Sequence, residues 1–576
     1  MSNFFTDNPD LQATVRSLDL ARIVRLREDD YEQAQDFAYA PKDLDDALDS
    51  YARTLEIVGD IAGEFVAPRA EDVDRAGAEL VDGEVRYAPG IVESLERLTQ
   101  ADLMGITLPR KYGGLNFPVS VLVMIVEMVS RADPALMNIF GLQDISETVN
   151  KFADEEIKAA YLPRFASGEV TGSMALTEPE AGSDLQNVQL KATEQPDGTW
   201  RLSGVKRFIT NGNGRISLVL ARSEEGTTDA RGLSMFLYER DEHMRIRRLE
   251  DKLGIHGSPT CELQFSDAPA RLVGERRRGL TTYVMSLMNG ARIAIAAQAQ
   301  GIAEAAYRAA SKYADERVQF GAPIRRLTAV AAMLADMKVD VEASRALLYE
   351  TSLIVDMNDG LEHRLELLST SAASAEEVRE LRGELKRFTR LAALFTPISK
   401  ALATEMANRV AYDSLQIHGG SGYMRDFAVE RHSRDARITN IYEGTTQLQV
   451  VAAIGGVLGG ALAERLDEYD AGDLAATPEL LERLRAARRR LDEAVATVRQ
   501  AGDERFRDFH ARRLVEMGTD LVCGYLLLRD AQRDTRKLLV ARHFIDAACG
   551  RISGGAHRIS ESRPSDLDDL TALSRD

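Results

Sequence analysis

The stretch NIYEGTTQLQ, residues 440–449, places a single carboxylate, Glu443, among residues that carry no charge. The residues after it are mostly small, hydroxylated or amidic, so backbone and hydroxyl donors surround the acid. A carboxylate in such a setting can accept a proton as a general base. It can equally be an N-cap or surface glutamate, and position alone favours neither reading.

Other catalytic chemistry has little support in the sequence. The eight histidines form no HExxH pattern and no Cys/His cluster has ligand spacing, so we expect no metal site. A serine hydrolase is not indicated either, because GGSG at residues 419–422 only superficially resembles a GxSxG elbow.

Three glycine-rich pieces could bring backbone N–H groups close to a phosphate or a ring. They are EAGSD (180–184), TNGNG (210–214) and GGSG (419–422). None is a GxGxxG between a strand and a helix, so a Rossmann nucleotide site is not indicated. Taken singly, each is more often a turn than a binding loop.

The elements that must position these pieces follow an α, β, α order. Residues 42 to about 166 are predicted to be helical from apolar residues three and four apart, with a break near Asp133–Pro134. Residues 170 to 271 show short alternating stretches flanked by glycines, which predicts a β-rich domain. Residues 280–455 return to helix, and residues 475–560 predict a further, amphipathic helical part.

Five motifs occur in sequence on this frame: MALTEPEAGSD (174–184), RFITNG (207–212), RVQFGAPI (317–324), QIHGGSGY (416–423) and IYEGTTQLQ (441–449). Together they resemble the acyl-CoA dehydrogenase family, flavoenzymes that desaturate acyl thioesters, over about residues 45–455. The resemblance implies an α+β fold in five parts. These are an N-terminal extension (1–41), an N-terminal helical domain (42–168), a middle β domain (169–275), a C-terminal four-helix-bundle-like domain (276–455) and a helical extension (456–576).

The resemblance also implies bound FAD. The residues expected to contact it in the β domain are Leu176, Thr177, Ser183, Phe208 and Thr210. Those expected in the helical part are Arg317, Gln319, Phe320, Gln416, Gly419, Gly420, Thr445 and Gln447. Arg317, Gln319 and Phe320 are expected to reach the cofactor of a neighbouring subunit, and arginine suits a diphosphate because its fork meets phosphate oxygens in pairs.

Glu443 matches the catalytic base of the family. Its carboxylate is expected to take the α-proton of an acyl-CoA, and its backbone N–H to hydrogen-bond the thioester oxygen as enolate charge builds. A dry site is expected to raise the pKa of Glu443 toward neutrality. The expected substrate contacts are Ser183, Arg292, Tyr442 and Gly444.

Three positions depart from the usual pattern. Leu327 and Thr328 stand where polar cofactor contacts are usual, and Asn289 stands where an acid is frequent. Some relatives carry the base on the long helix near Ala291, and alanine there favours Glu443 as the base.

Composition limits the partners. The net charge of −19 makes a general nucleic-acid binder unexpected. Three scattered cysteines, no apolar run of about 20 residues and no leader-like N-terminus indicate a cytoplasmic protein. The resemblance implies acyl-CoA as substrate, an electron-transferring flavoprotein as acceptor, and a homodimer or homotetramer.

The chain is longer than the common dehydrogenases of this type and is similar to a larger bacterial branch. The insertion between about 357 and 390 is expected to be a solvated helical hairpin. The C-terminal extension is expected to pack on its own chain or a neighbouring subunit, and membrane attachment is the less favoured alternative. Two other functions stay open at this point, an acyl-CoA oxidase and a non-catalytic member of the family.

Overall fold

A computed structural model describes residues 2–369, 374–472, 474 and 477–574. The chain forms two compact units. Unit 1 contains Met1–Asn8, Arg27–Ala305 and Met424–Thr439; unit 2 contains Pro9–Leu26, Ala306–Tyr423 and Asn440–Asp576. The five domain ranges expected from the sequence remain a prediction.

Helices form much of unit 1, where the spacing of apolar residues predicts them. The carboxylate of Asp43 accepts the backbone N–H of Asp46 and caps α3, and Asp133 caps α7 by accepting from Ala135. The break predicted at Asp133–Pro134 is confirmed: α6 ends at Ala132, and Pro134 begins α7, where its missing N–H costs no helical hydrogen bond. The helices are α3 (Leu44–Asp60), α4 (Ala70–Ala76), α5 (Pro89–Gln100), α6 (Val119–Ala132), α7 (Pro134–Gly141), α8 (Ile145–Phe152), α9 (Glu155–Ala166) and α13 (Val429–Thr439).

A β-hairpin interrupts the region that was predicted to be wholly helical. Its strands are β1 (Glu79–Val81) and β2 (Glu84–Arg86), joined by Asp82 and Gly83 with φ of 54° and 83°. Asp-Gly suits a two-residue hairpin turn because both positions need positive φ. Strands of three residues are too short to show the alternation on which a strand prediction depends.

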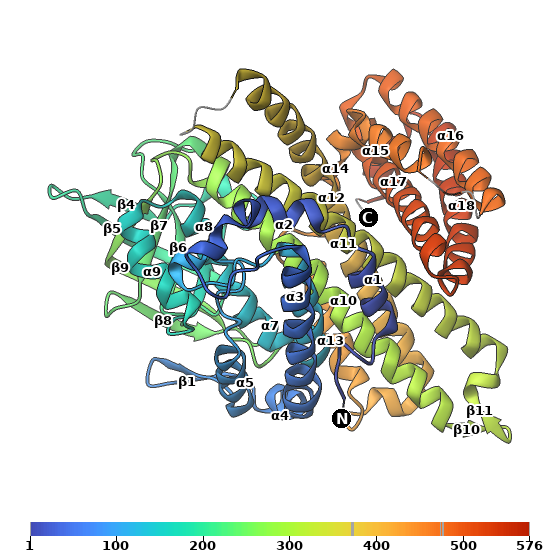
Figure 1. The fold of residues 1–576 in the computed structure, drawn as a ribbon, viewed down its shortest axis with the longest axis horizontal. Helices are drawn as coiled ribbons and strands as arrows, with labels where there is room; N and C mark the ends of the chain where they lie inside the picture. Colours follow the sequence, from blue (N-terminus) through green and yellow to red (C-terminus); the bar gives the residue numbers. More distant parts are fainter. Residues whose placement is uncertain (1, 370–373, 473, 475–476, 575–576) are drawn as a thin grey trace. The chain divides into compact units, whose positions relative to one another are not determined.

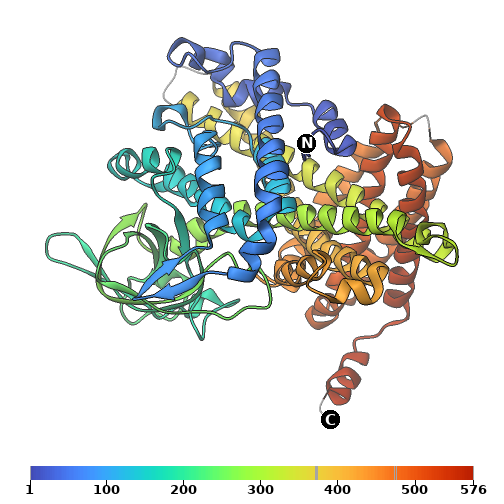
Figure 2. The same ribbon diagram turned by 90° about the horizontal axis from the view of Figure 1, so that it is seen from below.

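The predicted β domain is confirmed as a seven-stranded sheet (Figures 1 and 2, teal to green). The order is β3-β6-β4-β5-β9-β7, with β8 on β9, and the path closes on itself because β6 also pairs with β7. The strands are β3 (Gly172–Ala175), β4 (Lys191–Glu194), β5 (Trp200–Thr210), β6 (Ile216–Arg222), β7 (Leu233–Glu239), β8 (Met244–Leu249) and β9 (Thr260–Val273).

Both faces of this sheet are covered. Leu218 and Leu220 of β6 belong to a core with α8 and α9, whereas Val219 and Ala221 belong to a second core with Trp200 and other residues of the sheet. Side chains alternate between the faces of a strand, so a strand buried on both faces becomes continuously apolar.

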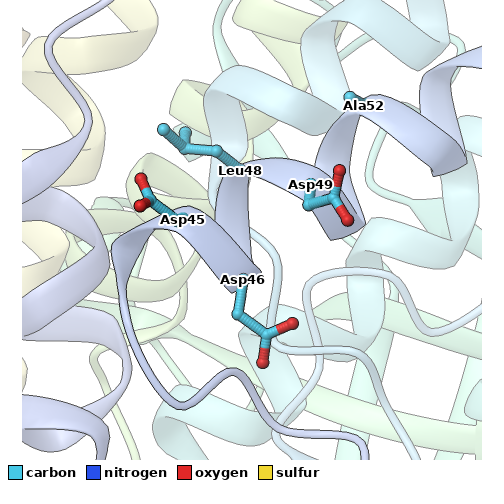
Figure 3. Close-up of a pocket in the computed structure, with 5 residues that line it drawn as sticks. All are labelled: Asp45, Asp46, Leu48, Asp49 and Ala52. Carbon is cyan, nitrogen blue, oxygen red and sulfur yellow. The ribbon is translucent and has the colours of Figure 1, made fainter.

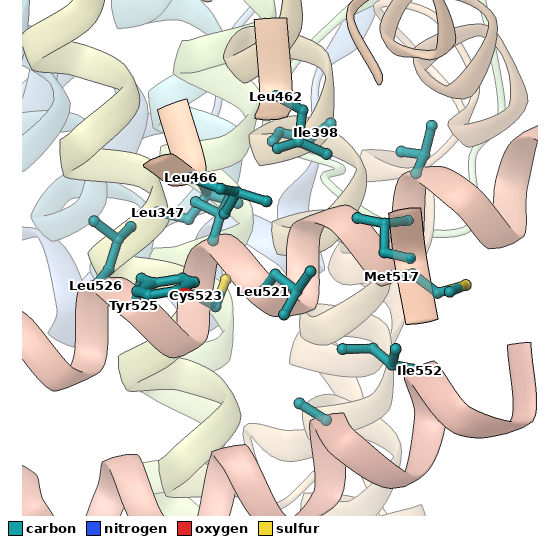
Figure 4. Close-up of a cluster of buried hydrophobic side chains, with 14 of the residues drawn as sticks. Leu347, Ile398, Leu462, Leu466, Met517, Leu521, Cys523, Tyr525, Leu526 and Ile552 are labelled. Carbon is teal, nitrogen blue, oxygen red and sulfur yellow. The ribbon is translucent and has the colours of Figure 1, made fainter. Parts of the chain in front are cut away.

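Long helices dominate unit 2. They form a single large core that extends into the C-terminal segment (Figure 4), with Leu347, Ile398, Leu462, Leu466, Leu521 and Leu526 among its members. The helices are α1 (Pro9–Ser17), α2 (Ala21–Arg27), α11 (Thr328–Ser369), α12 (Ala375–His418), α14 (Thr446–Leu458), α15 (Ala461–Asp470), α16 (Pro478–Ala501), α17 (Glu504–Arg533), α18 (Lys537–Glu561) and α19 (Asp566–Leu573); α10 (Met285–Glu316) spans both units.

The C-terminal helices therefore pack on their own chain, as the sequence predicts. Helix α17 contacts α11, α12, α14, α16 and α18. The predicted solvated hairpin is also helical on both sides, in α11 up to Ser369 and in α12 from Ala375, and its tip at 370–373 lies outside the described residues. Arg22 of α2 hydrogen-bonds Glu384 on this hairpin.

A cluster of buried charges joins α1 to α11 and α18 in unit 2. Asp10 of α1 pairs with Arg345 of α11 and with Lys537 of α18, and Lys537 also pairs with Glu342. Burial alone would raise the pKa of Asp10, but Lys537 and Arg345 hold it far below its usual value. The acid is thus charged and paired inside the protein.

Within the described part of the chain, no single helix is long and apolar enough to cross a membrane. The pair α14 and α15 passes that test jointly, with a bend of 68° between the two helices.

Candidate active site

Glu443 lies in the loop just before α14, on an unusual backbone. Its φ is 51°, and the next residue, Gly444, has a φ of 86°. Glycine adopts positive φ freely, but a glutamate there costs on the order of 1–3 kcal/mol and persists only where its surroundings hold it. Thr445 then caps α14, its hydroxyl accepting the N–H of Leu448 at 3.4 Å.

Two side chains hold the backbone around Glu443. Lys400 of α12 is fully buried, and its Nζ donates to the carbonyl oxygens of Tyr442 at 2.9 Å and Gly444 at 2.6 Å. Nε2 of Gln449, on the first turns of α14, donates to Gly444 O at 2.8 Å and Glu443 O at 3.3 Å. Three successive carbonyls of the loop are therefore hydrogen-bonded by side chains.

A third side chain, Glu405 of α12, joins the two ends of the loop. Its Oε1 accepts from the Thr446 hydroxyl at 2.6 Å and from the Asn440 amide at 3.2 Å. The backbone N–H of Thr446 also donates to Asn440 O at 3.2 Å. The loop that carries the half-buried Glu443 is thus closed at its base and fixed on one long helix.

In unit 1 the MALTEPEAGSD and RFITNG motifs lie together. Lys206 of β5 is fully buried, and its Nζ donates to Leu176 O at 2.8 Å and to Glu178 Oε1 at 2.9 Å. The N–H of Arg207 donates to Thr177 O at 2.9 Å. Burial lowers the pKa of Lys206 to about 8, against the opposing effect of Glu178. Leu176 is buried in a core, whereas Ser183 is exposed.

The strand β5 turns Phe208 out of the sheet. The pairing with β9 shifts register between Lys206 and Ile209, so Phe208 occupies a β-bulge with a φ of 61°. Its ring is 52% exposed and lies 4.6 Å from the Arg207 guanidinium. Thr210 ends the strand beside Asn211, which is buried and donates to Gly172 O at 2.9 Å.

In unit 2 the RVQFG and QIHGG motifs are also brought together. The Tyr313 ring stacks on His418 with centroids 4.2 Å apart, and the N–H of Arg317 donates to Tyr313 O at 2.8 Å. Phe320 tips the short hairpin of β10 (Val318–Gln319) and β11 (Ala322–Pro323), with a φ of 53° and 92% exposure.

The groups on unit 2 have side chains and backbone that suit an anionic ligand. Arg317 is exposed to solvent. The acids next to it pair with other cations, Asp315 with Arg325 and Glu316 with Lys312. After α12 ends near the exposed Gln416, a Cβ built on Gly419 or on Gly420 would meet nothing within 4 Å. The open space beside these two glycines would let phosphate oxygens approach the backbone, and a forked cation suits such oxygens. On unit 1, the outward Phe208 offers its face to a ring. Gln447 is likewise exposed on α14.

The expected substrate contacts divide between the units. Tyr442 and Gly444 flank Glu443 in unit 2, whereas Ser183 and Arg292 belong to unit 1. Nη1 of Arg292 donates to Asn289 Oδ1 at 3.3 Å, so the residue that replaces the frequent acid still contacts this arginine.

Two other surface features hold none of these residues. A shallow hollow on α3 is lined by Asp45, Asp46, Leu48, Asp49 and Ala52 (Figure 3), and represents a solvated acidic helix face. In the described residues, the group with metal-ligand proximity is Asp241, Glu242 and His243. Hydrogen bonds of Asp241 to His243 and Tyr238 in that turn account for its geometry.

Comparison with known proteins identifies the family. Three family models match the chain in succession. They describe the acyl-CoA dehydrogenase N-terminal domain (residues 52–169), middle domain (173–268) and C-terminal domain (278–454). The chain belongs to the acyl-CoA dehydrogenase family. It is therefore an oxidoreductase. A further model, described as acyl-CoA dehydrogenase C terminal, matches residues 459–567.

Two curated family members illustrate the range of similarity. The chain is 33% identical over 496 residues to 3-methylmercaptopropionyl-CoA dehydrogenase of Ruegeria pomeroyi, covering 80% of this chain and 79% of that protein. It is 33% identical over 414 residues to an acyl-CoA dehydrogenase of Bacillus subtilis, covering 70% and 97%.

Solved structures agree with the acyl-CoA dehydrogenase fold. Butyryl-CoA dehydrogenase from Megasphaera elsdenii is 31% identical with a TM-score of 0.60, covering 71% of this chain and 98% of that one. An acyl-CoA dehydrogenase complexed with FAD from Bacillus anthracis, 24% identical, has a TM-score of 0.74 and covers 91% and 90%, and so shares the fold through the C-terminal helices.

Sequence reasoning missed the residues that hold the dehydrogenase motifs in place. Lys400, Glu405 and Gln449 fix the Glu443 loop, and Lys206 and Glu178 fix the loop after β3. The signal that could have found them was a lone charge in an apolar stretch, as in FTPISKALA at residues 395–403, because a buried lysine needs partners.

Proposed function

We propose that the protein is an FAD-dependent dehydrogenase that introduces an α,β double bond into an acyl-CoA thioester, with Glu443 as the base. The observation that carries the proposal is a single carboxylate on a strained backbone that Lys400 and Gln449 hold in place. Strain of this kind collects at functional sites because only over-determined surroundings sustain it.

The chain's own residues supply binding, orientation and proton transfer. The Glu443 carboxylate takes the α-proton, and the Glu443 N–H donates to the thioester oxygen as negative charge develops there. Tyr442 and Gly444 line the thioester, with Arg292 and Ser183 as further substrate contacts. FAD, when bound, would supply the acceptor for the β-hydrogen as hydride, and this transfer would complete the two-electron oxidation.

FAD is proposed to be held by residues of the five sequence motifs. Those on the β-domain side are Leu176, Thr177, Ser183, Phe208 and Thr210; those on the helical side are Arg317, Gln319, Phe320, Gln416, Gly419, Gly420, Thr445 and Gln447. The open glycines and the exposed arginine support this assignment, as does the presence of FAD in the complex from Bacillus anthracis.

We further propose an electron-transferring flavoprotein as the acceptor and a homodimer or homotetramer as the working assembly. One similar solved structure, 30% identical with a TM-score of 0.60, belongs to work on the electron transferring flavoprotein of Acidaminococcus fermentans. A cytoplasmic location is also a proposal, which cell fractionation tests.

The proposed substrate is an acyl-CoA, and its acyl chain is to be identified by testing a panel of acyl-CoA thioesters. Purified protein loaded with FAD is mixed anaerobically with short, long, branched and sulfur-containing acyl-CoAs, including 3-methylmercaptopropionyl-CoA, and the loss of the yellow flavin absorbance is followed. Glu443→Gln keeps the size and hydrogen-bonding shape but not the base, so reduction should slow by about 10³-fold. A variant that reduces flavin at near the wild-type rate shows that the base is elsewhere.

Oxygen as acceptor is tested with the same protein. Peroxide formation in air at the rate of dye-coupled turnover identifies an oxidase. Turnover only with a dye or an electron-transferring flavoprotein supports the proposed dehydrogenase.

A further inference from the structure

Lys400 is placed to do more than fill the core. It lies in α12 with no exposed surface, and its ammonium donates to the carbonyl oxygens on either side of Glu443. Burying a cation is costly unless it is paired or hydrogen-bonded, so the arrangement couples the lysine firmly to this loop. Lysine suits it because its compact head has three donors and can serve two carbonyls at once.

The hydrogen bond to Tyr442 O determines the direction of the Glu443 N–H. The two groups belong to one peptide unit, and the described backbone contains no cis peptide bond. In a planar trans peptide the N–H points opposite to the C=O. Because Tyr442 C=O points at Lys400, the Glu443 N–H points away from α12 and is held there.

The charge of Lys400 acts on the same residue. Its ammonium hydrogen-bonds the carbonyl oxygens of the residues before and after Glu443. The ammonium is buried, and screening between charges is weak inside a protein. Glu405 is a second charged side chain that hydrogen-bonds the loop, and its Oε1 accepts from Thr446 and Asn440 at the loop's base. From α14, the neutral side chains of Gln449 and Thr446 take part in these contacts.

We propose that Lys400 is a positioning residue for the dehydrogenation: it aims the Glu443 N–H at the thioester oxygen and favours the ionised form of the Glu443 carboxylate. This inference rests on the proposed function of Glu443. Sequence spacing does not reveal it, because Lys400 lies 43 residues before Glu443 in a run of apolar and small residues.

The test separates the two effects with two variants of the full-length flavoprotein. Lys400→Met removes both the donor and the charge, and Lys400→Gln keeps an N–H donor but removes the charge. Lys386→Met is the matched control, because Lys386 is an exposed lysine of the same helix. FAD content and the apparent melting temperature are measured for every protein before kinetics.

We expect Lys400→Met to lower kcat/KM by about 10- to 10³-fold, since loss of one oxyanion donor costs about 10²- to 10³-fold and a misaimed one costs less. Lys400→Gln should lose less. In both variants the acid limb of the kcat/KM profile should move to higher pH by about one unit, because removing a nearby positive charge raises a carboxylate's pKa. Lys386→Met should match the wild type.

Proton abstraction is also measured without hydride transfer. An acyl-CoA analogue with sulfur in place of the β-carbon has no β-hydrogen, so loss of deuterium from its α-carbon reports the base alone. Exchange should slow in both Lys400 variants, and amide hydrogen exchange at residues 441–446 should quicken most in Lys400→Met. These readouts need a folded protein, which Lys400→Gln provides if Lys400→Met aggregates.

Two results would overturn the inference. The first is that Lys400→Gln shows the same acid limb of the kcat/KM profile and the same rate of α-deuterium loss as the wild type. The second is activity loss that follows FAD content alone, which would make the lysine merely structural. A wild-type enzyme that oxidises no acyl-CoA and exchanges no α-deuterium refutes the proposed function itself, so the two failures are distinguishable.

Discussion

Replacement of Gly444 by alanine tests whether the backbone beside the base is as tightly specified as the structure indicates. Gly444 has a φ of 86°, and a Cβ built on it would lie 2.7 Å from Gln449 Nε2. Alanine must therefore adopt left-handed backbone and push away the amide that hydrogen-bonds Glu443 O and Gly444 O. Gly455→Ala is the control, because a Cβ there meets nothing within 4 Å.

The magnitude follows from these contacts. Left-handed backbone costs an alanine about 1–2 kcal/mol, and each neutral hydrogen bond that Gln449 loses costs about 0.5–1.5 kcal/mol. With both Gln449 hydrogen bonds lost, the loop is expected to lose about 2–5 kcal/mol, equivalent to a fall in kcat/KM of up to roughly 5,000-fold. Gly455→Ala should leave kcat unchanged and stabilise α14 by about 0.5–1 kcal/mol, since alanine is the better helix former.

The assay is anaerobic flavin reduction by the best acyl-CoA of the panel, with amide hydrogen exchange at residues 441–446 measured in parallel. Gly444→Ala should show slow reduction and fast exchange, with FAD still bound. A variant with kcat/KM within about threefold of the wild type, well under the factor of ten that 1.4 kcal/mol produces, would refute the claim that this loop conformation is required.

Three further predictions concern the cofactor, pH and the C-terminal helices. Arg317→Ala should lower FAD retention on dialysis by a factor that corresponds to about 1.5–3 kcal/mol, the value of a charge-assisted hydrogen bond. Arg326→Ala, at an exposed arginine, should retain FAD like the wild type. Equal FAD retention by Arg317→Ala and the wild type would contradict the phosphate contact. Burial raises the pKa of Asp435 to about 6. Because this pKa lies above the unfolded value, its contribution to stability is present at low pH and is lost as pH rises through about 6. Asp435→Asn should therefore melt higher relative to the wild type at pH 8 than at pH 5, and parallel melting curves would show that Asp435 titrates normally. Truncation after about residue 460 removes most of a shared core and should give aggregates by size-exclusion chromatography. A monodisperse product, or liposome flotation of the full chain that truncation abolishes without a change in stability, would contradict packing on the chain itself.

The parts of the fold that follow from periodicity were predictable. Helices α3 and α6, the break at Pro134 and the alternating strands of the β domain result from local spacing, capping and glycine positions. The C-terminal amphipathic helices were predictable as helices, and the need to bury their apolar faces predicted packing. The hairpin at Asp82–Gly83 carried a turn signal, but its strands were too short to outweigh the helical periodicity on either side.

The site was predictable only in its motif residues. The five motifs place Glu443, Phe208 and Arg317 in the sequence, but the bulge that exposes Phe208 depends on its pairing with β9. The lysines that hold the motifs are distant in sequence from the groups they contact. Lys206 lies 28 residues from Glu178, and Lys400 lies 44 residues from Gly444. A contact over such a separation leaves no periodic pattern in the sequence.

The buried pairing of Asp10 with Arg345 and Lys537 has a consequence for biosynthesis. The acid is made first, but its partners lie 335 residues later in Arg345 and close to the end of the chain in Lys537. At about 5–20 residues per second, α1 leaves the ribosome roughly half a minute to two minutes before α18. Unit 1, whose segments are complete by Thr439, can assemble during that delay. Helix α1 cannot complete its charge pairs until α18 has been made, so the nascent chain is expected to depend on chaperones in the interval.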